Sequence, residues 1–328
     1  MHGGEEMFKK KAKRYVALDL NEYIVRALVM ASPDIEQADV YEYPLNKGIF
    51  ENDILIDEMA LYEMMKTCIQ EWGIKRYNVR FFVPDSTVML KTFEHPSDVN
   101  SAKLKGFVEM ELGQTIHLPF SQPLIDVFDS NPNDGEAILF AAPSEEVNKI
   151  AGLLDDLHLE PTTADVRSLA TIRFLENTIG LEEKMSYLIS EWTISGVSIS
   201  IYTGGKVEFL RYQSIDTFNE KWQSKNDSDE ITFSYDGDLE EYHAQLIDQI
   251  AEIDRILNFY RFSLYKGEKA VDEIITLGDS PEMNYIASEM KANFDTPVRY
   301  IDDSQVQIYH PNLKSKHIPL IGLVYREA

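Results

Sequence analysis

The stretch Tyr15-Val-Ala-Leu-Asp-Leu-Asn-Glu-Tyr-Ile-Val-Arg-Ala-Leu-Val-Met30 decides the fold of the chain. Its two apolar runs, residues 15–20 and 23–30, flank a polar break at Asn21-Glu22. This pattern is typical of two buried β-strands joined by a tight turn. Asp19 lies inside the first run, where an unpaired carboxylate would be costly to bury, so this side chain is a candidate site residue.

Length and composition describe a globular chain with room for two domains. Its 328 residues exceed the roughly 100–200 residues of a typical domain, and its 44% hydrophobic and 27% charged content is ordinary for a soluble protein. The formal net charge of −25 repels nucleic-acid phosphates and anionic lipid headgroups, which disfavours nucleic-acid binding and broad membrane binding. A basic peptide or protein would be steered towards such a surface.

The sequence predicts a cytoplasmic location. The single cysteine, Cys68, cannot form an internal disulfide, which fits a reducing compartment. No apolar run approaches the roughly 18–20 residues that span a bilayer, so we expect no transmembrane segment. Residues 1–14 lack the apolar core of a signal peptide and form a basic tail. We expect this tail to be solvated, with contact to a membrane surface as the alternative.

Strands and helices alternate through residues 15–86 in the order of an α/β layer. After the opening hairpin we expect a strand at 38–44, a helix over 54–72 that ends at Gly73, and a strand at 79–83. The segment 87–162 has the pattern of a small inserted α+β subdomain. Its expected elements are strands at 87–93, 124–129 and 137–142, a hairpin turn at 130–135, and helices at 100–112 and 145–157.

A helix at 167–178 returns the chain to the first domain, which we expect to comprise 15–86 and 163–185. Residues 186–328 form the second domain, and they open with strand, turn and strand as the first domain does. This pattern indicates an internal duplication, although the sequence identity of the two halves is too weak to prove it. The acidic stretch 223–238 is expected to be a surface loop with a fragmentary strand at 231–235.

Several segments match a known family in their order and spacing. They are Val16-Ala-Leu-Asp-Leu-Asn-Glu-Tyr-Ile-Val-Arg26, Phe81-Phe-Val-Pro-Asp-Ser-Thr87, Glu109-Met-Glu111, Leu118-Pro-Phe120, Ala164-Asp-Val-Arg-Ser-Leu-Ala170, Glu252-Ile-Asp-Arg-Ile-Leu-Asn-Phe-Tyr260 and Gly322. Together they resemble PilM, the actin-like family of type IV pilus assembly, which is itself similar to the cell-division protein FtsA. The resemblance covers nearly the whole chain.

The resemblance implies an α/β, actin-like (ribonuclease H-like) fold of two domains, with the small α+β subdomain inserted in the first. It also implies a cytoplasmic adaptor at the inner face of the cell membrane. Family members bind the cytoplasmic N-terminal segment of PilN, a bitopic inner-membrane protein, in a groove between the first domain and the inserted subdomain. The expected groove region is represented by Val88, Leu90, Thr92, Ile116, Leu118 and Phe120.

Family members often hold ATP or ADP with magnesium between the main domains, but here the three loops that would do so are degenerate. The first keeps Asp19 and then reads Asn21-Glu22-Tyr23, the second reads Glu191-Trp192-Thr193, and the adenosine loop reads Gly278-Asp279-Ser280. Carboxylates in this position repel a polyphosphate unless a metal intervenes. We therefore expect a pseudo-site without ATPase activity. The alternative is that Asp19 and Glu191 still hold magnesium and a nucleotide.

Three functions remain open at this point. The first is a non-catalytic adaptor of a pilus or competence-type pseudopilus. The second is a PilM-type protein whose bound nucleotide regulates partner binding. The third is an FtsA-like division protein, which is expected to end in an amphipathic membrane helix that residues 324–328 do not show. No hydrolase or phosphotransferase motif is present, and the seven histidines lack ligand spacing, so we expect neither an enzyme nor a metal site.

Overall fold

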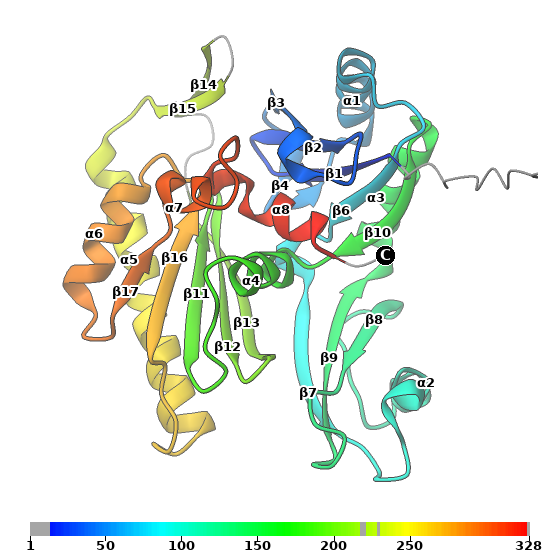
Figure 1. Ribbon diagram of the computed structural model, residues 1–328, viewed down its shortest axis with the longest axis vertical. Coiled ribbons are helices and arrows are strands. Elements are labelled where there is room, and N and C mark those ends of the chain that lie inside the picture. The colour runs from blue at the N-terminus through cyan, green and yellow to red at the C-terminus, as the bar shows by residue number, and fades with distance from the viewer. Residues whose placement is uncertain (1–13, 217–220, 228–229, 327–328) are drawn as a thin grey trace, which may run out of the picture.

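Two five-stranded mixed sheets with the same strand order form the two main domains (Figure 1). The computed structural model describes residues 14–216, 221–227 and 230–326, so the expected basic tail at 1–14 lies, except for Arg14, outside the described residues. The first sheet, ordered β10-β6-β1-β2-β3, consists of β1 (Tyr15–Leu20), β2 (Ile24–Met30), β3 (Asp39–Pro44), β6 (Asn78–Phe82) and β10 (Glu160–Asp165). The second sheet, ordered β13-β12-β11-β16-β17, consists of β11 (Ser186–Trp192), β12 (Gly196–Thr203), β13 (Lys206–Ser214), β16 (Glu273–Gly278) and β17 (Val298–Tyr300).

Each sheet combines an antiparallel meander with parallel strands. β1 pairs antiparallel with β2, with Tyr15 opposite Met30 and Leu20 opposite Val25, and it pairs parallel with β6. β11 likewise pairs antiparallel with β12 and parallel with β16. The predicted opening hairpin and the predicted repeat of its pattern in the second half are therefore confirmed.

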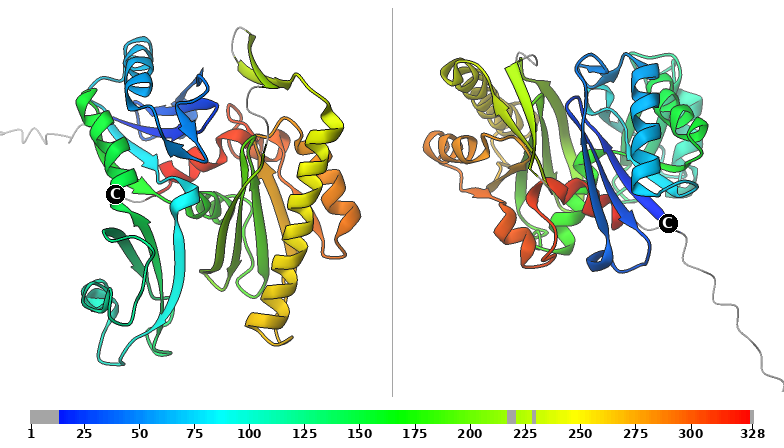
Figure 2. Two further views of the ribbon diagram at one scale, coloured as in Figure 1. Left: turned by 180° about the vertical axis from the view of Figure 1, so that it is seen from behind. Right: turned by 90° about the horizontal axis from the view of Figure 1, so that it is seen from above.

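Helices cover the outer faces of both sheets and fill the space between the sheets (Figures 1 and 2). They are α1 (Glu58–Trp72), α3 (Ser144–Asp156), α4 (Arg167–Asn177), α5 (Leu239–Asn258), α6 (Met283–Asn293), α7 (Asp303–Gln307) and α8 (Ile318–Val324). α1 and α3 pack on the outer face of the first sheet, and α5 and α6 pack on the outer face of the second. α4 and α8 lie between the sheets, where Ala170, Phe174 and Leu320 share one apolar core with strand residues of both domains.

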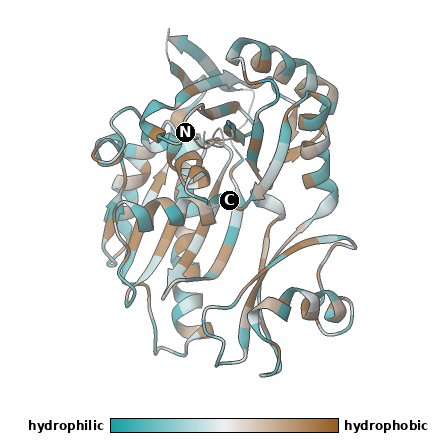
Figure 3. Ribbon diagram, turned by 45° about the vertical axis from the view of Figure 1, so that its right-hand side comes forward, coloured by the Kyte–Doolittle hydropathy of each residue, from teal (hydrophilic) through white to brown (hydrophobic). Residues whose placement is uncertain are grey.

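Local sequence signals fix the ends of these helices, and apolar residues follow the strands and the buried helix faces (Figure 3). The Asp57 side chain accepts a hydrogen bond from the Ala60 N–H (2.9 Å) and so caps the start of α1. Gly73 ends α1 in the left-handed conformation (φ 67°), as predicted. α5 begins at an Asp238 cap and continues into a π-helix, Phe259–Leu264.

The inserted subdomain is a three-stranded antiparallel sheet ordered β7-β9-β8, with one helix packed on it. Its elements are β7 (Met89–Glu94), α2 (Ser101–Glu111), β8 (Pro123–Phe128) and β9 (Glu136–Pro143). It is smaller than the expected segment 87–162. Val147, Ile150 and Leu154 of α3 are buried in the core of the first sheet, and β10 pairs with β6, so both elements belong with that sheet.

The acidic stretch expected to be a surface loop forms a two-stranded hairpin of β14 (Trp222–Asp227) and β15 (Glu230–Tyr235). The hairpin extends from the second domain to the first. The Ile231 N–H donates to Glu42 Oε2 on β3 (3.2 Å), and the Phe233 ring meets the Tyr23 ring edge-on with 5.1 Å between centroids. The fragmentary strand expected at 231–235 is confirmed as β15. The surface loop expected around it was wrong, because these contacts come from residues about 190 and 210 positions away in the chain, which local polarity does not reveal. Within the described ranges, the structure contains no helix with the length and apolarity needed to cross a membrane.

Candidate functional site

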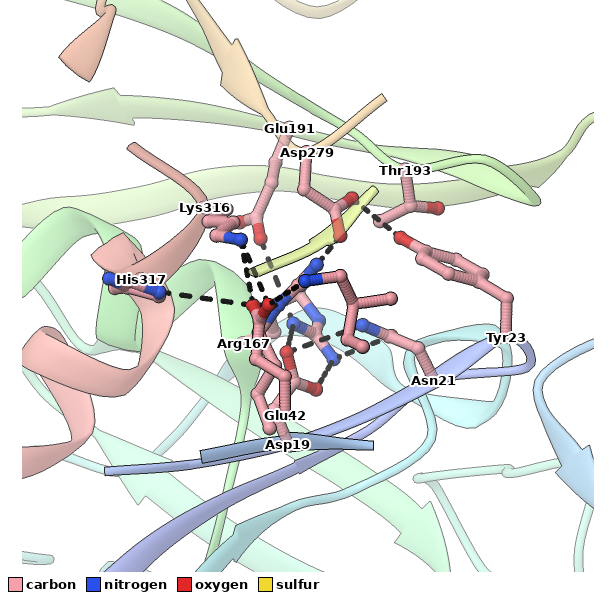
Figure 4. Close-up of polar contacts among 12 residues, drawn as sticks. Asp19, Asn21, Tyr23, Glu42, Arg167, Glu191, Thr193, Asp279, Lys316 and His317 are labelled. Atoms are coloured by element: carbon pink, nitrogen blue, oxygen red, sulfur yellow. Dashed lines mark hydrogen bonds and ion pairs between the residues drawn. The ribbon is translucent and has the colours of Figure 1, made fainter. Parts of the chain in front are cut away.

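Three loops at the carboxyl ends of β1, β11 and β16 meet in a cleft between the main domains (Figure 4). Parallel strands of α/β sheets place their following loops at one edge, which is where such folds usually bind ligands. The structure brings together these residues predicted from the sequence: Asp19, Asn21, Glu191, Thr193, Gly278 and Asp279. Tyr23 donates its hydroxyl to Asp279 Oδ1 (2.5 Å). Glu22 lies at the margin, where it accepts a hydrogen bond from the Asp53 N–H (2.7 Å), and Ser280 lines a hollow farther out.

Arg167, the first residue of α4, projects into this cleft and places a positive charge among its carboxylates. Its guanidinium donates to both carboxylate oxygens of Asp19, at 2.5 and 2.9 Å, in the two-pronged geometry that gives strong ion pairs. It also donates to Asn21 Oδ1 (3.1 Å) and to Asp85 Oδ2 (2.8 Å). The guanidinium lies 4.7 Å from the centroid of the Phe82 ring, which adds a cation–π contact.

A second arginine, Arg26 on β2, crosses the cleft from the first domain to the second. Its guanidinium donates to Asp279 Oδ2 (2.6 Å) on the adenosine loop and to Glu42 Oε1 (2.7 Å) on β3. The Arg26 and Arg167 side chains are only 4% and 5% exposed, so both ion-pair clusters are shielded from solvent.

These side chains leave almost no space where the phosphates and metal of a nucleotide would lie. The cavity between the three loops has a volume of about 10 Å³, roughly the space of one water molecule. Pockets for small ligands measure roughly 300–1,000 Å³. The residues present therefore do not fit the metal and phosphates of a nucleotide at this place, because protein cations already occupy the positions that face the carboxylates.

Gly278 is required here for packing. Its φ is 142°, and a Cβ atom added to it would lie 1.9 Å from the carbonyl oxygen of Trp192 on the neighbouring strand. The glycine that remains in the adenosine loop is thus explained by the close approach of β16 to β11, without reference to a ligand.

Two larger polar hollows flank the closed cleft, with volumes of about 390 and 530 Å³. Both are lined by Lys314 and Lys316, whose charges are paired with Glu230 and Glu42. Lys316 Nζ lies 2.9 Å from each of these two carboxylates, and Lys314 Nζ lies 2.6 Å from Glu230. Because Glu230 belongs to the β14–β15 hairpin, these pairs hold the hairpin against the mouth of the cleft.

Burial shifts the titration of several cleft groups. It raises the pKa of Glu191 to about 8, even though Arg167 lies 3.8 Å away and opposes the shift. Glu191 is therefore protonated at neutral pH, and its Oε2 accepts a hydrogen bond from the Thr171 hydroxyl (2.7 Å). Burial likewise raises the pKa of Asp85 and, well above its usual range, that of Asp53.

We expect Glu191→Gln to change the dependence of stability on pH. The pKa of Glu191 is raised in the folded state. Its contribution to the free energy of unfolding is therefore fully present below the pKa of the unfolded state, and it is lost as the pH rises through about 8. Over this window the wild type loses up to about 1.4 kcal/mol per pH unit from this group, whereas glutamine does not titrate. When the pH is raised from 5.5 to 8, the free energy of unfolding measured by urea denaturation should fall by at least about 1 kcal/mol less in the variant than in the wild type. Parallel pH profiles would contradict the assignment.

A second candidate region lies between the inserted subdomain and the main domains. Two adjoining apolar hollows, of about 270 and 290 Å³, share Asp126, Phe140, Asp165, Leu169 and Arg326. We call these two hollows together the α4–β8 groove. Its walls are the β8–β9 face, α4 and the start of β13, and Arg326 pairs with Asp165 (2.8 Å) at its centre.

The six residues predicted for a partner groove do not lie together. Ile116, Leu118 and Phe120 pack into the core beneath α2, on the opposite side of the small sheet. Val88 lines one hollow of the α4–β8 groove, Leu90 packs into the core between the domains, and Thr92 is exposed.

Comparison with known proteins assigns the chain to a family. A family model described as type IV pilus assembly protein PilM matches residues 18–320. The chain belongs to the PilM family. Among solved structures, a PilM–PilN type IV pilus biogenesis complex is similar at 16% identity, covering 94% of this chain and 97% of that one, with a TM-score of 0.72.

Two further structures place this PilM-family chain among actin-like folds. MreB5 of Spiroplasma citri bound to ADP is 11% identical and covers 95% of each chain, with a TM-score of 0.52. A Bacteroides thetaiotaomicron protein with an actin-like ATPase fold and unknown function is 10% identical, covering 99% of this chain and all of that one, with a TM-score of 0.51. At these identities the likeness shows the fold alone, and it confirms the predicted fold class. A search of curated protein sequences gave no significant match.

Both places contain residues that the sequence did not single out. In the cleft these are Arg167 and Arg26, and a signal for them existed, since several carboxylates expected in one buried cleft require cations. In the α4–β8 groove they are Leu124 and Phe128, which are 43% and 45% exposed on β8. They alternate along β8 with Ile125 and Val127, which pack towards α2, so the strand has one covered and one open face.

Proposed function

We propose that this PilM-family protein is a nucleotide-independent adaptor of type IV pilus or competence-type pseudopilus assembly, without ATP hydrolysis. The observation that carries the proposal is the guanidinium of Arg167, which binds both oxygens of Asp19 where a metal and phosphates would lie. The guanidinium is an intramolecular cation at that position. It neutralises the carboxylates, and it ties α4 to the first sheet.

A nucleotide-regulated protein of the same family is less compatible with the cleft. Binding would require Arg167 and Arg26 to leave their partners, and breaking a buried ion pair costs about 3–5 kcal/mol. The β14–β15 hairpin would also have to release Lys314 and Lys316. The incoming phosphates would then face Asp279, whose carboxylate repels them.

For the partner, we propose the cytoplasmic N-terminal segment of a PilN-like inner-membrane protein, which would keep the adaptor at the inner face of the membrane. The α4–β8 groove suits a short extended segment. It offers two apolar hollows for side chains, and β8 is one of the two edge strands of its sheet within the described residues. The groove lining itself has balanced charge, with the carboxylates of Asp126, Asp165 and Glu176 beside the cations of Lys105, Arg173, Lys206 and Arg326. The net charge of −25 favours basic residues in the parts of the segment outside the hollows.

The closed cleft predicts that nucleotides do not stabilise the protein. Addition of 5 mM magnesium and ATP, ADP or a non-hydrolysable ATP analogue should shift the melting temperature by less than about 1 °C, since a ligand that does not bind the folded state does not stabilise it. Differential scanning fluorimetry measures this directly. A rise of several degrees at that concentration would favour the nucleotide-regulated alternative.

Charge introduced into the α4–β8 groove should weaken partner binding. Phe128→Asp places a carboxylate where an apolar side chain would dock, and we expect at least a tenfold loss of affinity for a labelled peptide of the PilN-like segment, because burying an unpaired charge is costly. Fluorescence anisotropy measures the loss. Met110→Asp is the matched control, since Met110 is 66% exposed on α2 in the same subdomain but lies outside the groove. Equal binding by both variants would place the partner elsewhere.

A further inference from the structure

α4 belongs to both candidate regions at once. Its first residue, Arg167, lies in the interdomain cleft, and its later residues Leu169, Ile172, Arg173 and Glu176 line the α4–β8 groove. At about 1.5 Å per residue, the cleft end and the groove end of this rigid helix are only about 13 Å apart. A displacement of the cleft end therefore moves one wall of the groove.

The contacts along α4 tie successive parts of it to different domains. Arg167 binds Asp19 and Asp85 of the first domain, and Thr171 donates to Glu191 of the second. Farther along the helix, Arg173 donates to Asp165, and Glu176 accepts a hydrogen bond from the Tyr202 hydroxyl. Of these contacts, the ion pairs of Arg167 with Asp19 and Asp85 are those at the cleft end of the helix.

Arg26 provides the internal contrast. It is as deeply buried as Arg167, carries the same charge and pairs with two carboxylates, Asp279 in the same cleft and Glu42 in a flanking hollow. However, Arg26 is on β2 and lines neither hollow of the groove. Loss of Arg26 should weaken the contact between the domains without moving α4.

We propose that Arg167 is a positioning residue for partner binding, because its contacts with Asp19 and Asp85 hold α4 in the place that shapes the α4–β8 groove. This inference rests on the proposed function for the identity of the site. It adds that the groove is permanently formed in this protein, because a side chain of the chain itself fixes the helix that a bound nucleotide would otherwise have to fix.

The test compares Arg167→Ala with Arg26→Ala in the full chain by amide hydrogen exchange. We expect Arg167→Ala to lower the protection of α4 (Arg167–Asn177) and β8 (Pro123–Phe128) amides at least tenfold more than Arg26→Ala does. The affinity for the labelled PilN-like peptide should fall at least tenfold in Arg167→Ala and less than threefold in Arg26→Ala. If Arg167→Ala does not fold, Arg167→Lys and Arg26→Lys give the same comparison, because lysine keeps the charge but cannot make the forked contacts.

Equal loss of α4 and β8 protection in the two variants, or unchanged protection in the Arg167 variant, would overturn the inference. Failure of the proposed function is a separate outcome. In that case the wild type does not bind the peptide, while the exchange comparison still decides whether Arg167 holds the groove in shape.

Discussion

Replacing Arg167 with alanine is expected to lower the free energy of unfolding by about 3–5 kcal/mol, the range measured when one partner of a buried ion pair is removed. The reason is that the Asp19 carboxylate, 2% exposed, stays in the cleft without its cation, and the Asp85 carboxylate loses one of its donors. Chemical denaturation followed by circular dichroism gives the loss. A loss below about 1 kcal/mol would mean that these pairs contribute no more than surface pairs do.

Two further variants separate the ion pair from a general effect of losing an arginine. Arg255→Ala removes an arginine that is 73% exposed and paired with Glu252 on the surface of α5, and it should cost at most about 0.5 kcal/mol. Adding Asp19→Asn to Arg167→Ala should recover part of the loss, because the double variant no longer buries that unpaired carboxylate. Strictly additive losses would show that the two side chains stabilise the protein independently.

The features that the sequence predicted correctly are those that depend on neighbouring residues. The apolar runs on each side of Asn21-Glu22 are long enough to predict the β1–β2 hairpin, and the end of α1 at Gly73 follows from one residue that adopts a positive φ. The repeated strand–turn–strand opening predicted two similar domains for the same reason. Each of these signals is carried by a short continuous segment, where periodicity and turn chemistry act.

The features that could not be predicted depend on contacts between distant parts of the chain. Arg167 and Asp19 are 148 residues apart, and Arg26 and Asp279 are 253 residues apart. The acidic substitutions in the three loops suggested a site that had lost its ligand. In the structure these carboxyl groups have partners. Asp279 pairs with Arg26, and Glu191 is protonated beside Arg167. Glu22 faces no arginine and accepts a hydrogen bond from the Asp53 N–H.

The six residues predicted for a partner groove lie apart in the structure for a related reason. Sequence alternation shows that a strand has two faces, but it does not show which face a helix covers. α2 covers the face of the small sheet that includes Ile116 and Phe120, which leaves Leu124 and Phe128 of β8 on the open side. The extent of the insertion was overestimated because α3 has the same amphipathic pattern whether it packs on the small sheet or on the first sheet.

A methyl group added at Gly322 is expected to disrupt the packing of the two helices between the domains. A Cβ atom at this position of α8 would lie 1.8 Å from the carbonyl oxygen of Ala170 on α4. Since the clash is with backbone, a side-chain rotation cannot relieve it, and we expect Gly322→Ala to cost about 3 kcal/mol or more, at or above the upper end for overpacking. Thermal and chemical denaturation measure this loss, and soluble yield at reduced temperature shows whether the variant still folds.

Gly152→Ala is the matched control, because Gly152 lies in the interior of α3 with open space around it. Alanine there should stabilise the protein by up to about 1 kcal/mol, the usual gain for glycine to alanine inside a helix. Adding Ala170→Gly should not rescue Gly322→Ala, because the obstructing atom is the carbonyl oxygen, which glycine retains. Rescue would show instead that the Ala170 side chain, and not the backbone of α4, is what obstructs a Cβ atom at position 322. The absence of rescue would mean that the backbone of α4 at Ala170 is what leaves no room for a Cβ atom at position 322 of α8.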